Sequence, residues 1–163
     1  QVKNKKRMIF IESLKDFYPI IFLTSAGSAF GNIIKNSDLI NFLPIFFELI
    51  EINLINICFI SFILGAIIKT SQGSSTSAMI ISSSLIFPLI SQLNLESFGI
   101  IMTTLSIGAG SMMISHVNDS YFWIVSKKSD MNLKDSLFYF STMTIVQSLG
   151  TFLFIIFLVI INS

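Results

Sequence analysis

Charged residues are scarce in this chain of 163 residues, since Asp, Glu, Lys and Arg together make up 12% of it. Ordinary soluble domains contain about 25% charged residues, and they need them to stay dispersed in water. Hydrophobic residues make up 53% of the chain. This composition excludes an ordinary soluble domain and predicts a membrane protein whose main partner is the lipid bilayer. The net charge of +1 gives no indication of a nucleic-acid partner.

Cysteine and histidine occur once each, as Cys58 and His116. A single cysteine excludes an intramolecular disulfide and a zinc cluster built from thiolates. With one histidine and no cysteine near it, we expect no metal site and no cofactor. A signal peptide is not expected either, because the first apolar run follows a basic cluster, residues 3–7, without a small-residue cleavage site.

Long hydrophobic segments dominate the remainder. Five are near the length that crosses a bilayer: residues 18–34, 53–68, 70–88, 98–115 and 137–161. Segment 39–51 is shorter and contains Pro44, which favours a re-entrant or interfacial helix. In the last segment, Thr144 and Gln147 mark a face for helix contacts. The predicted fold class is therefore an all-α, polytopic membrane protein with about five transmembrane helices, some of them broken or re-entrant.

The domain boundaries follow from charge. We expect residues 1–16 to be a basic cytoplasmic lead-in and residues 17–163 to be a transmembrane domain. Basic loops stay on the cytoplasmic side, which places residues 3–7, Lys69 and residues 127–134 inside and the C-terminus outside. The chain begins with Gln1, and its segments are few for a complete transporter, so we expect the C-terminal part of a longer protein.

Segment 70–88 is rich in hydroxyl groups and has two interpretations. A serine-rich inner helix could bond its hydroxyls to its own backbone. Alternatively, Gly73 permits a turn, and Ser74, Ser75 and Thr76 after it begin a half-helix whose free N–H groups bind an anion. We favour the half-helix.

Polar residues also gather between residues 106 and 123. His116, Asn118 and Asp119 would point in different directions on a regular helix, so we expect irregular backbone there. Inside a membrane such backbone occurs only where it is buried in protein or lines a cavity, and broken helices form the midplane sites of secondary transporters. Segments 73–77 and 108–120 are therefore predicted to form two walls of one cavity.

These two segments resemble a known family. Gly73-Ser-Ser-Thr-Ser-Ala-Met79 is similar to the Gly-Ser-Ala-Thr-Val-Ala-Met segment of the gluconate permeases. Gly108-Ala-Gly-Ser111 and His116-Val-Asn-Asp-Ser-Tyr-Phe-Trp123 resemble their Gly-Ala-Gly-Ser and His-Val-Asn-Asp-Ser-Gly-Phe-Trp signature. Weaker similarity extends to residues 26–30 and to the final hydrophobic segment.

The resemblance implies half of an inverted-repeat carrier of the ion-transporter superfamily. Its function would be proton-coupled uptake of gluconate or a related sugar acid across the cytoplasmic (inner) membrane. The partners implied are a small anionic sugar acid, protons and the N-terminal half of the same permease, while association with further copies is left open. An enzyme is not expected.

Three positions depart from the family pattern. Tyr121 replaces a glycine, which adds bulk where we expect the loop to need a positive φ. Ser75 and Ser77 replace alanine and valine. Lys69 stands where the family usually has arginine, which keeps the charge but loses bidentate carboxylate binding. The departures put the identity of the sugar acid in question more than transport itself.

Each candidate residue has an expected role and an alternative. Ser74, Ser75 and Thr76 would bind the carboxylate or hydroxyls of the substrate, and Asn118 and Ser120 its other hydroxyls. Asp119 is the first candidate for proton coupling, because desolvation can raise a carboxyl pKa, and His116 is the second. The alternatives are a helix N-cap for Asp119 and a structural role for His116. Trp123 is expected to be an interfacial anchor, with a substrate platform as its alternative. Lys69 is expected to be a cytoplasmic flanking charge, with attraction of the anionic substrate as its alternative.

Three other functions compete with proton-coupled uptake. A carboxylate carrier driven by sodium remains an alternative, because hydroxyls and carbonyls at broken helices also suit Na⁺. A structural membrane subunit without transport activity is a second. An intramembrane enzyme is disfavoured, because serine, histidine and aspartate lie within a few residues of each other without a nucleophile elbow.

Overall fold

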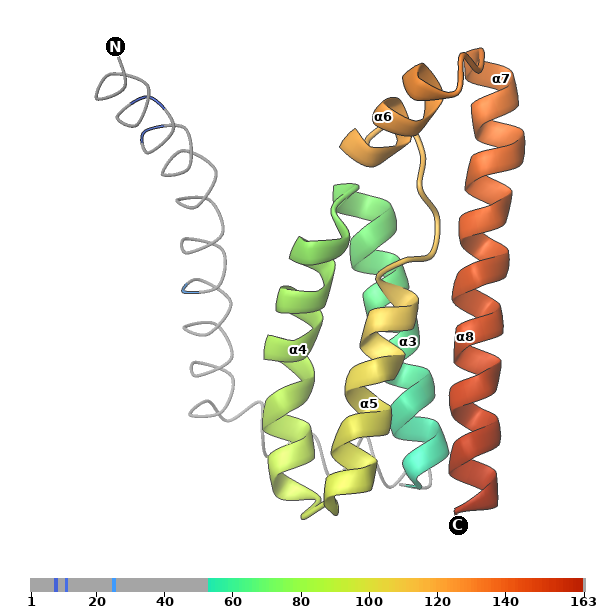
Figure 1. Ribbon diagram of the computed structural model, residues 1–163. Helices are drawn as coiled ribbons and strands as arrows, with labels where there is room; N and C mark the ends of the chain where they lie inside the picture. Colours follow the sequence, from blue (N-terminus) through green and yellow to red (C-terminus); the bar gives the residue numbers. More distant parts are fainter. Residues whose placement is uncertain (1–7, 9–10, 12–24, 26–52, 163) are drawn as a thin grey trace.

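The computed structural model of the chain describes residues 53–162, together with Met8, Ile11 and Ser25 (Figure 1). Apart from those three residues, the expected lead-in 1–16, segments 18–34 and 39–51 and the similarity at 26–30 lie outside the described residues. Across 53–162, every regular element is a helix. This confirms the all-helical expectation for that part of the chain.

The helices follow one another closely. In order they are α3 (Leu54–Gln72), α4 (Ser75–Gln92), α5 (Ser97–Gly110), α6 (Ser120–Lys128), α7 (Leu133–Asp135), η1 (Ser136–Phe140) and α8 (Ser141–Ile161). The last three form one continuous helix of 29 residues, in which η1 is a π-helical turn. Within the described part, this helix and α3 are the two that are long and apolar enough to cross a membrane.

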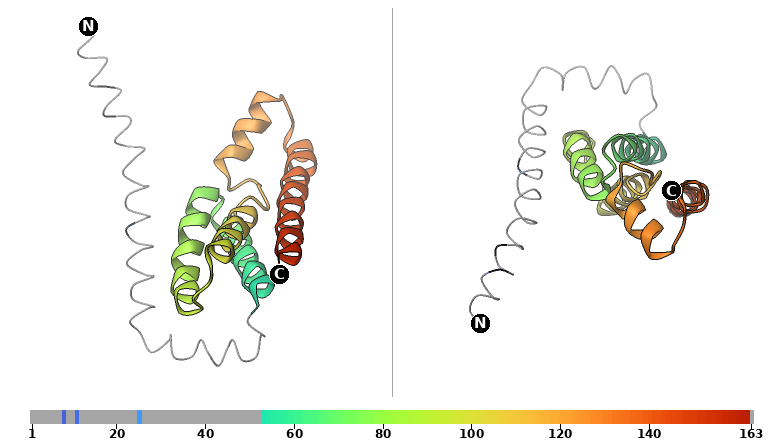
Figure 2. Two further views of the ribbon diagram at one scale, coloured as in Figure 1. Left: turned by 60° about the horizontal axis from the view of Figure 1, so that its bottom comes forward. Right: turned by 90° about the horizontal axis from the view of Figure 1, so that it is seen from above.

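Helices α3, α4 and α5 run up and down beside one another, and α8 packs against α3 and α5 (Figures 1 and 2). Their core is formed by one set of mostly apolar side chains from α3, α5 and α8: Cys58, Phe62, Met102, Ala109, Phe152, Ile155 and Val159. The rings of Phe62 and Phe152 stack with centroids 4.2 Å apart. Large apolar side chains such as Phe87, Phe154 and Phe157 are exposed on the outside, as expected for contact with lipid.

Two glycines let α3 and α5 approach closely. A Cβ atom on Gly65 would lie 2.8 Å from the Ile107 carbonyl oxygen, and one on Gly110 would lie 2.0 Å from the Phe62 carbonyl oxygen. Small residues at a helix contact allow such backbone approach, and this is a common way to join helices in membranes. The pairing of α3 with α5 therefore depends on these two positions having no side chain.

Helix α5 is shorter than expected, because it ends at Gly110 and not near residue 115. Beyond it the chain is irregular up to Asp119, and side chains of α8 replace the lost helical hydrogen bonds. The Ser115 N–H donates to the Thr144 hydroxyl at 3.3 Å, and the Ser141 hydroxyl donates to the Ser115 carbonyl at 2.5 Å. Contact with α8 thus stabilises the irregular backbone that the sequence predicted around residues 116–119.

Substitution of Gly110 by alanine tests the helix contact. Because its Cβ would collide with backbone of α3, we expect Gly110→Ala to destabilise the protein by about 1 to 3 kcal/mol. Gly108→Ala is the matched control, since a Cβ there meets no atom within 4 Å, and alanine favours a helix over glycine by about 1 kcal/mol. The measurement is the thermal transition of the purified complete gene product in detergent. Equal transitions for the two variants would contradict the close contact.

Candidate functional site

The chain breaks its helical course between α3 and α4. Gly73 ends α3 in the left-handed conformation, with φ of 74°, and its N–H donates to the Lys69 carbonyl at 2.8 Å. A side chain at Gly73 would also meet the Asn118 carbonyl oxygen at 2.3 Å. Ser74 then caps α4 by accepting a hydrogen bond from the Ser77 N–H at 3.3 Å. The predicted break at Gly73 and the helix start after it are confirmed, but α4 continues for 18 residues to Gln92, and anion binding at its N-terminus stays a prediction.

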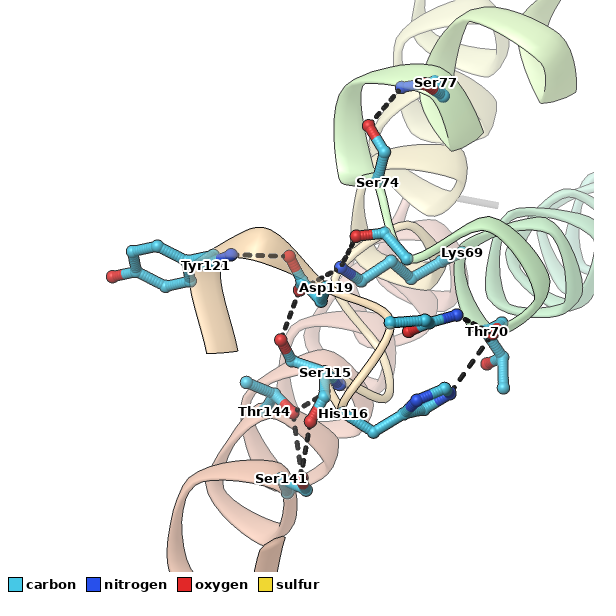
Figure 3. Close-up of polar contacts among 12 residues, drawn as sticks. Lys69, Thr70, Ser74, Ser77, Ser115, His116, Asp119, Tyr121, Ser141 and Thr144 are labelled. Carbon is cyan, nitrogen blue, oxygen red and sulfur yellow. Dashed lines mark hydrogen bonds and ion pairs between the residues drawn. The ribbon is translucent and has the colours of Figure 1, made fainter. Parts of the chain in front are cut away.

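The second break, residues 111–119, lies against the first (Figure 3). The Asn118 amide donates to the carbonyls of Thr70 at 3.0 Å and Ser71 at 3.3 Å, and His116 Nε2 lies 3.2 Å from the same Thr70 oxygen. The last carbonyls of a helix lack partners within it. Asn118 and His116 therefore satisfy the end of α3 and fasten the two breaks together.

A buried ion pair joins the breaks at their centre. The Lys69 ammonium lies 2.5 Å from Asp119 Oδ2, and the two residues are 2% and 6% exposed. Lys69 also donates to the Gly73 carbonyl at 3.3 Å. The Ser115 hydroxyl donates to the same carboxylate oxygen, and Oδ1 accepts from the Tyr121 N–H at 2.9 Å, which caps α6.

These contacts decide how the pair can stay charged. Burial disfavours both ions, and the penalty is repaid only when the remaining donors and acceptors are satisfied. Here the carboxylate accepts three hydrogen bonds, from an ammonium, a hydroxyl and an N–H group. The expected alternative for Asp119, a helix N-cap, is correct, and the same residue also holds the ion pair.

The sequence interpretation of Lys69 as a cytoplasmic flanking charge is wrong. Helix α3 does not end before Lys69 but continues to Gln72. Lys69 therefore lies in the last helical turn, beneath the start of α4 and against Asp119. Its charge is buried in protein, so it no longer supports the orientation that we derived from basic loops.

A pocket of about 580 Å³ lies beside the ion pair. Three parts of the chain line it: the α3–α4 junction, the segment that leads into α6, and the η1–α8 helix. The lining residues are Lys69, Gly73, Ser74, Ser75, Thr76, Met112, Ser115, Asp119, Ser120, Tyr121, Ile124, Phe140, Thr144 and Gln147. The two predicted walls face one cavity, and the η1–α8 helix adds a third wall.

The structure brings most of the predicted site residues together. Ser74, Ser75, Thr76, Asp119 and Ser120 all line the pocket. Asn118 and His116 do not, because their side chains are directed to the α3 carbonyls. The expectation that Asn118 would bind a substrate hydroxyl in this cavity is therefore not met in this arrangement.

Tyr121 also differs from expectation. It lies in the first turn of α6, and the non-glycine residues with positive φ in the described part are Asn94 and Asp130. The tyrosine therefore needs no left-handed backbone. Its ring packs edge-on against Phe140 with centroids 5.7 Å apart and lines the pocket, so it narrows the cavity where the family pattern has no side chain.

Sequence reasoning missed several pocket residues. The sequence pattern gives Ser115 no role and predicts only a helix contact for Thr144 and Gln147. Lys69 carried a usable signal, because a lysine in an apolar helix needs a buried acidic partner. Within residues 53–162, no group of three or more His, Cys, Asp or Glu side chains lies close enough to hold a metal ion.

Comparison with known proteins places the chain in a family. Residues 1–161 match the family model described as GntP family permease. The chain belongs to the GntP permease family. This confirms the resemblance that the sequence motifs indicated, and together with the two apolar helices it makes the chain a membrane protein.

Relatives in the GntP permease family are about three tenths identical to the chain. The inner membrane permease YgbN of Escherichia coli K12 is 29% identical over 134 residues, which are 82% of this chain and 28% of YgbN. A gluconate permease of Zymomonas mobilis is 30% identical over 133 residues, 81% of this chain and 28% of that protein. The low-affinity gluconate transporter of E. coli K12 is 29% identical over 150 residues, 91% of this chain and 32% of the transporter.

The chain thus spans less than a third of the length of these relatives. They are named as permeases and transporters, which confirms that the GntP permease family is not a family of enzymes. No solved structure matches the chain.

Removal of one or both members of the ion pair tests its role in stability. We expect Lys69→Met to cost about 3 to 5 kcal/mol, because it leaves a buried carboxylate without its cation. Lys69→Met combined with Asp119→Asn should recover most of this loss, since asparagine can still cap α6 and no charge is left unpaired. Thermal unfolding of the complete gene product in detergent measures both. A double variant less stable than Lys69→Met would argue against the pair.

Proposed function

We propose that the complete gene product is a secondary transporter that takes up gluconate or a related sugar acid together with a proton. The observation that carries the proposal is a pocket at two helix breaks that combines a buried lysine with hydroxyl groups at a helix N-terminus. Helix N-termini and cations both favour anions. The names of the relatives, two of which refer to gluconate, support the choice of substrate.

The lengths of the helices support a site at membrane depth. The 14 residues of α5 rise about 21 Å, less than the roughly 30 Å of a hydrocarbon core. The continuous helix from Leu133 to Ile161 extends beyond the junction of α3 and α4 in the view of Figure 1. We therefore infer that the irregular segment after α5 lies inside the bilayer. Irregular backbone is tolerated at that depth because it lines a polar cavity.

We further propose that this chain supplies one half of an inverted-repeat carrier of about five transmembrane helices, with residues 1–16 as a cytoplasmic lead-in. Carriers of this type place the substrate between two halves. The pocket is partly open in the described residues, which leaves a side for a second half to cover. The cytoplasmic membrane is the proposed location, with the lysines of residues 127–134 on the cytoplasmic side.

Within the pocket, we assign the substrate to Ser74, Ser75, Thr76 and Ser120, and proton coupling to Asp119. A proton is favoured over sodium because Asp119, the one carboxylate that lines the pocket among the described residues, is already neutralised by Lys69. His116 is a weaker coupling candidate, since its Nε2 contacts a helix-end carbonyl and not the pocket.

Uptake driven by an ion gradient distinguishes proton coupling from sodium coupling. Vesicles that hold the complete gene product are given labelled gluconate and either a pH gradient, acidic outside, or an inward sodium gradient. We expect accumulation with the pH gradient alone. Accumulation with sodium alone would defeat proton coupling, and no uptake under either gradient would favour a structural subunit.

The hydroxyl groups at the start of α4 test the position of the substrate. We expect Ser75→Ala with Thr76→Val to raise the KM for gluconate by about 10-fold, equivalent to about 1.4 kcal/mol for lost hydrogen bonds. Thr104→Val is the matched control, because the Thr104 hydroxyl is exposed outside the pocket and bonds to the Ile100 carbonyl of its own helix. Uptake at several gluconate concentrations measures KM. An unchanged KM in the α4 variant would mean that the substrate does not bind at the start of α4.

A further inference from the structure

We propose that Lys69 is the anchor for the substrate carboxylate and that Asp119 occupies this anchor while the pocket is empty. In this proposal the substrate and Asp119 compete for one ammonium group, and Asp119 is released by taking up a proton. The inference rests on the proposed function, and it adds the residue that recognises the anion and the reason why anion and proton move together.

The first support is that the carboxylate of Asp119 is the same functional group as the acid group of the proposed substrate. Asp119 places a carboxylate 2.5 Å from the Lys69 ammonium, at the wall of a pocket that both residues line. A sugar acid ends in the same functional group. The pocket therefore already contains, as part of the protein, the interaction that an incoming acid would make.

The second support is the set of donors on Lys69. An ammonium group has three N–H donors. Among the residues that the structure describes, it donates to Asp119 Oδ2 and to the Gly73 carbonyl. Within the described residues, one donor is left for a ligand, so a substrate carboxylate could begin to bind before Asp119 leaves.

The third support is that Asp119 can become neutral without losing its place. Its Oδ1 accepts from the Tyr121 N–H in the α6 cap, which does not require a charge. Its Oδ2 accepts from Ser115, and a hydroxyl can also accept. When Oδ2 is protonated, the hydrogen bond can reverse so that Asp119 donates to Ser115. The backbone of both breaks can stay where it is.

Charge balance then sets the stoichiometry. The empty pocket holds one ammonium and one carboxylate, with no net charge. The loaded pocket holds the ammonium, one substrate carboxylate and a neutral Asp119, again with no net charge. One proton enters with one anion, because either alone would leave an unpaired charge in a buried site.

No other charged group lines this pocket in the described part of the chain. α3 contributes Lys69, and the segment before α6 contributes Asp119. Tyr121 is the third titratable residue, while α4 and α8 contribute only hydroxyls and the Gln147 amide. His116 is near in sequence, but its Nε2 is held at the Thr70 carbonyl. The proton that accompanies the substrate is therefore assigned to Asp119.

Calorimetry on the purified complete gene product tests the exchange. Gluconate is titrated at pH 5.5 and pH 7.5 in buffers of different ionisation enthalpy, which gives the protons bound per gluconate. Wild type should bind about one proton per gluconate at pH 7.5. Asp119→Asn, which keeps the α6 cap but removes the competitor, should bind none and should hold gluconate about 10-fold more tightly at pH 7.5. Lys69→Met should weaken binding roughly 10- to 150-fold, the range for a hydrogen bond to a charged group.

Two exposed residues supply matched controls. Lys127→Met and Asp130→Asn make the same chemical changes outside the pocket, and both should behave as wild type. If Asp119→Asn still takes up a proton, or Lys69→Met binds like wild type, the exchange is overturned. A purely structural role for Asp119 would instead weaken gluconate binding in Asp119→Asn.

A measurement on wild type alone covers the case in which the variants do not fold. Uptake into vesicles with the membrane potential set by potassium and valinomycin should be electroneutral, with rates that change by less than 2-fold. Net charge movement would overturn the one-to-one exchange while leaving gluconate transport intact. Absence of any gluconate binding by wild type would instead contradict the proposed function itself.

Discussion

A buried ammonium and carboxylate, those of Lys69 and Asp119, hold together the two places where this helical chain leaves its helices. The pair joins residues 50 positions apart, one in the last turn of α3 and the other at the cap of α6. An unpaired charge in such surroundings would cost several kcal/mol, so each residue requires the other. The pair links the end of α3 to the start of α6, and the hydrogen bonds of Asn118, His116 and α8 add to this link.

The remaining polar groups of the junction also need partners, because irregular backbone away from water must still form its hydrogen bonds. Asn118 and His116 satisfy the carbonyl end of α3, and side chains of α8 satisfy Ser115. Close packing of α3 on α5 through Gly65 and Gly110 brings these groups within reach. The apolar core and the polar junction therefore depend on the same helix contacts.

The proposed transport of an anion rests on this arrangement. In the proposed exchange, the pocket accepts an acid only when the internal acid is neutralised, which would link binding to protonation by electrostatics alone. The GntP permease family supplies the context of transport, and the bulk of Tyr121 gives this member a pocket wall that the family pattern lacks.

The sequence alone determined the class of protein, the break at Gly73 and the loss of helix near residues 116–119, because composition, a turn-permitting glycine and adjacent polar residues act locally. It also indicated Asp119 as a helix cap. It did not determine the partner of Lys69, the place of Asn118 or the third pocket wall at Thr144 and Gln147. Those depend on which distant segments lie side by side, and on α3 continuing past Lys69. Only tertiary structure decides them, because the partner of a buried charge is set by packing and not by local pattern.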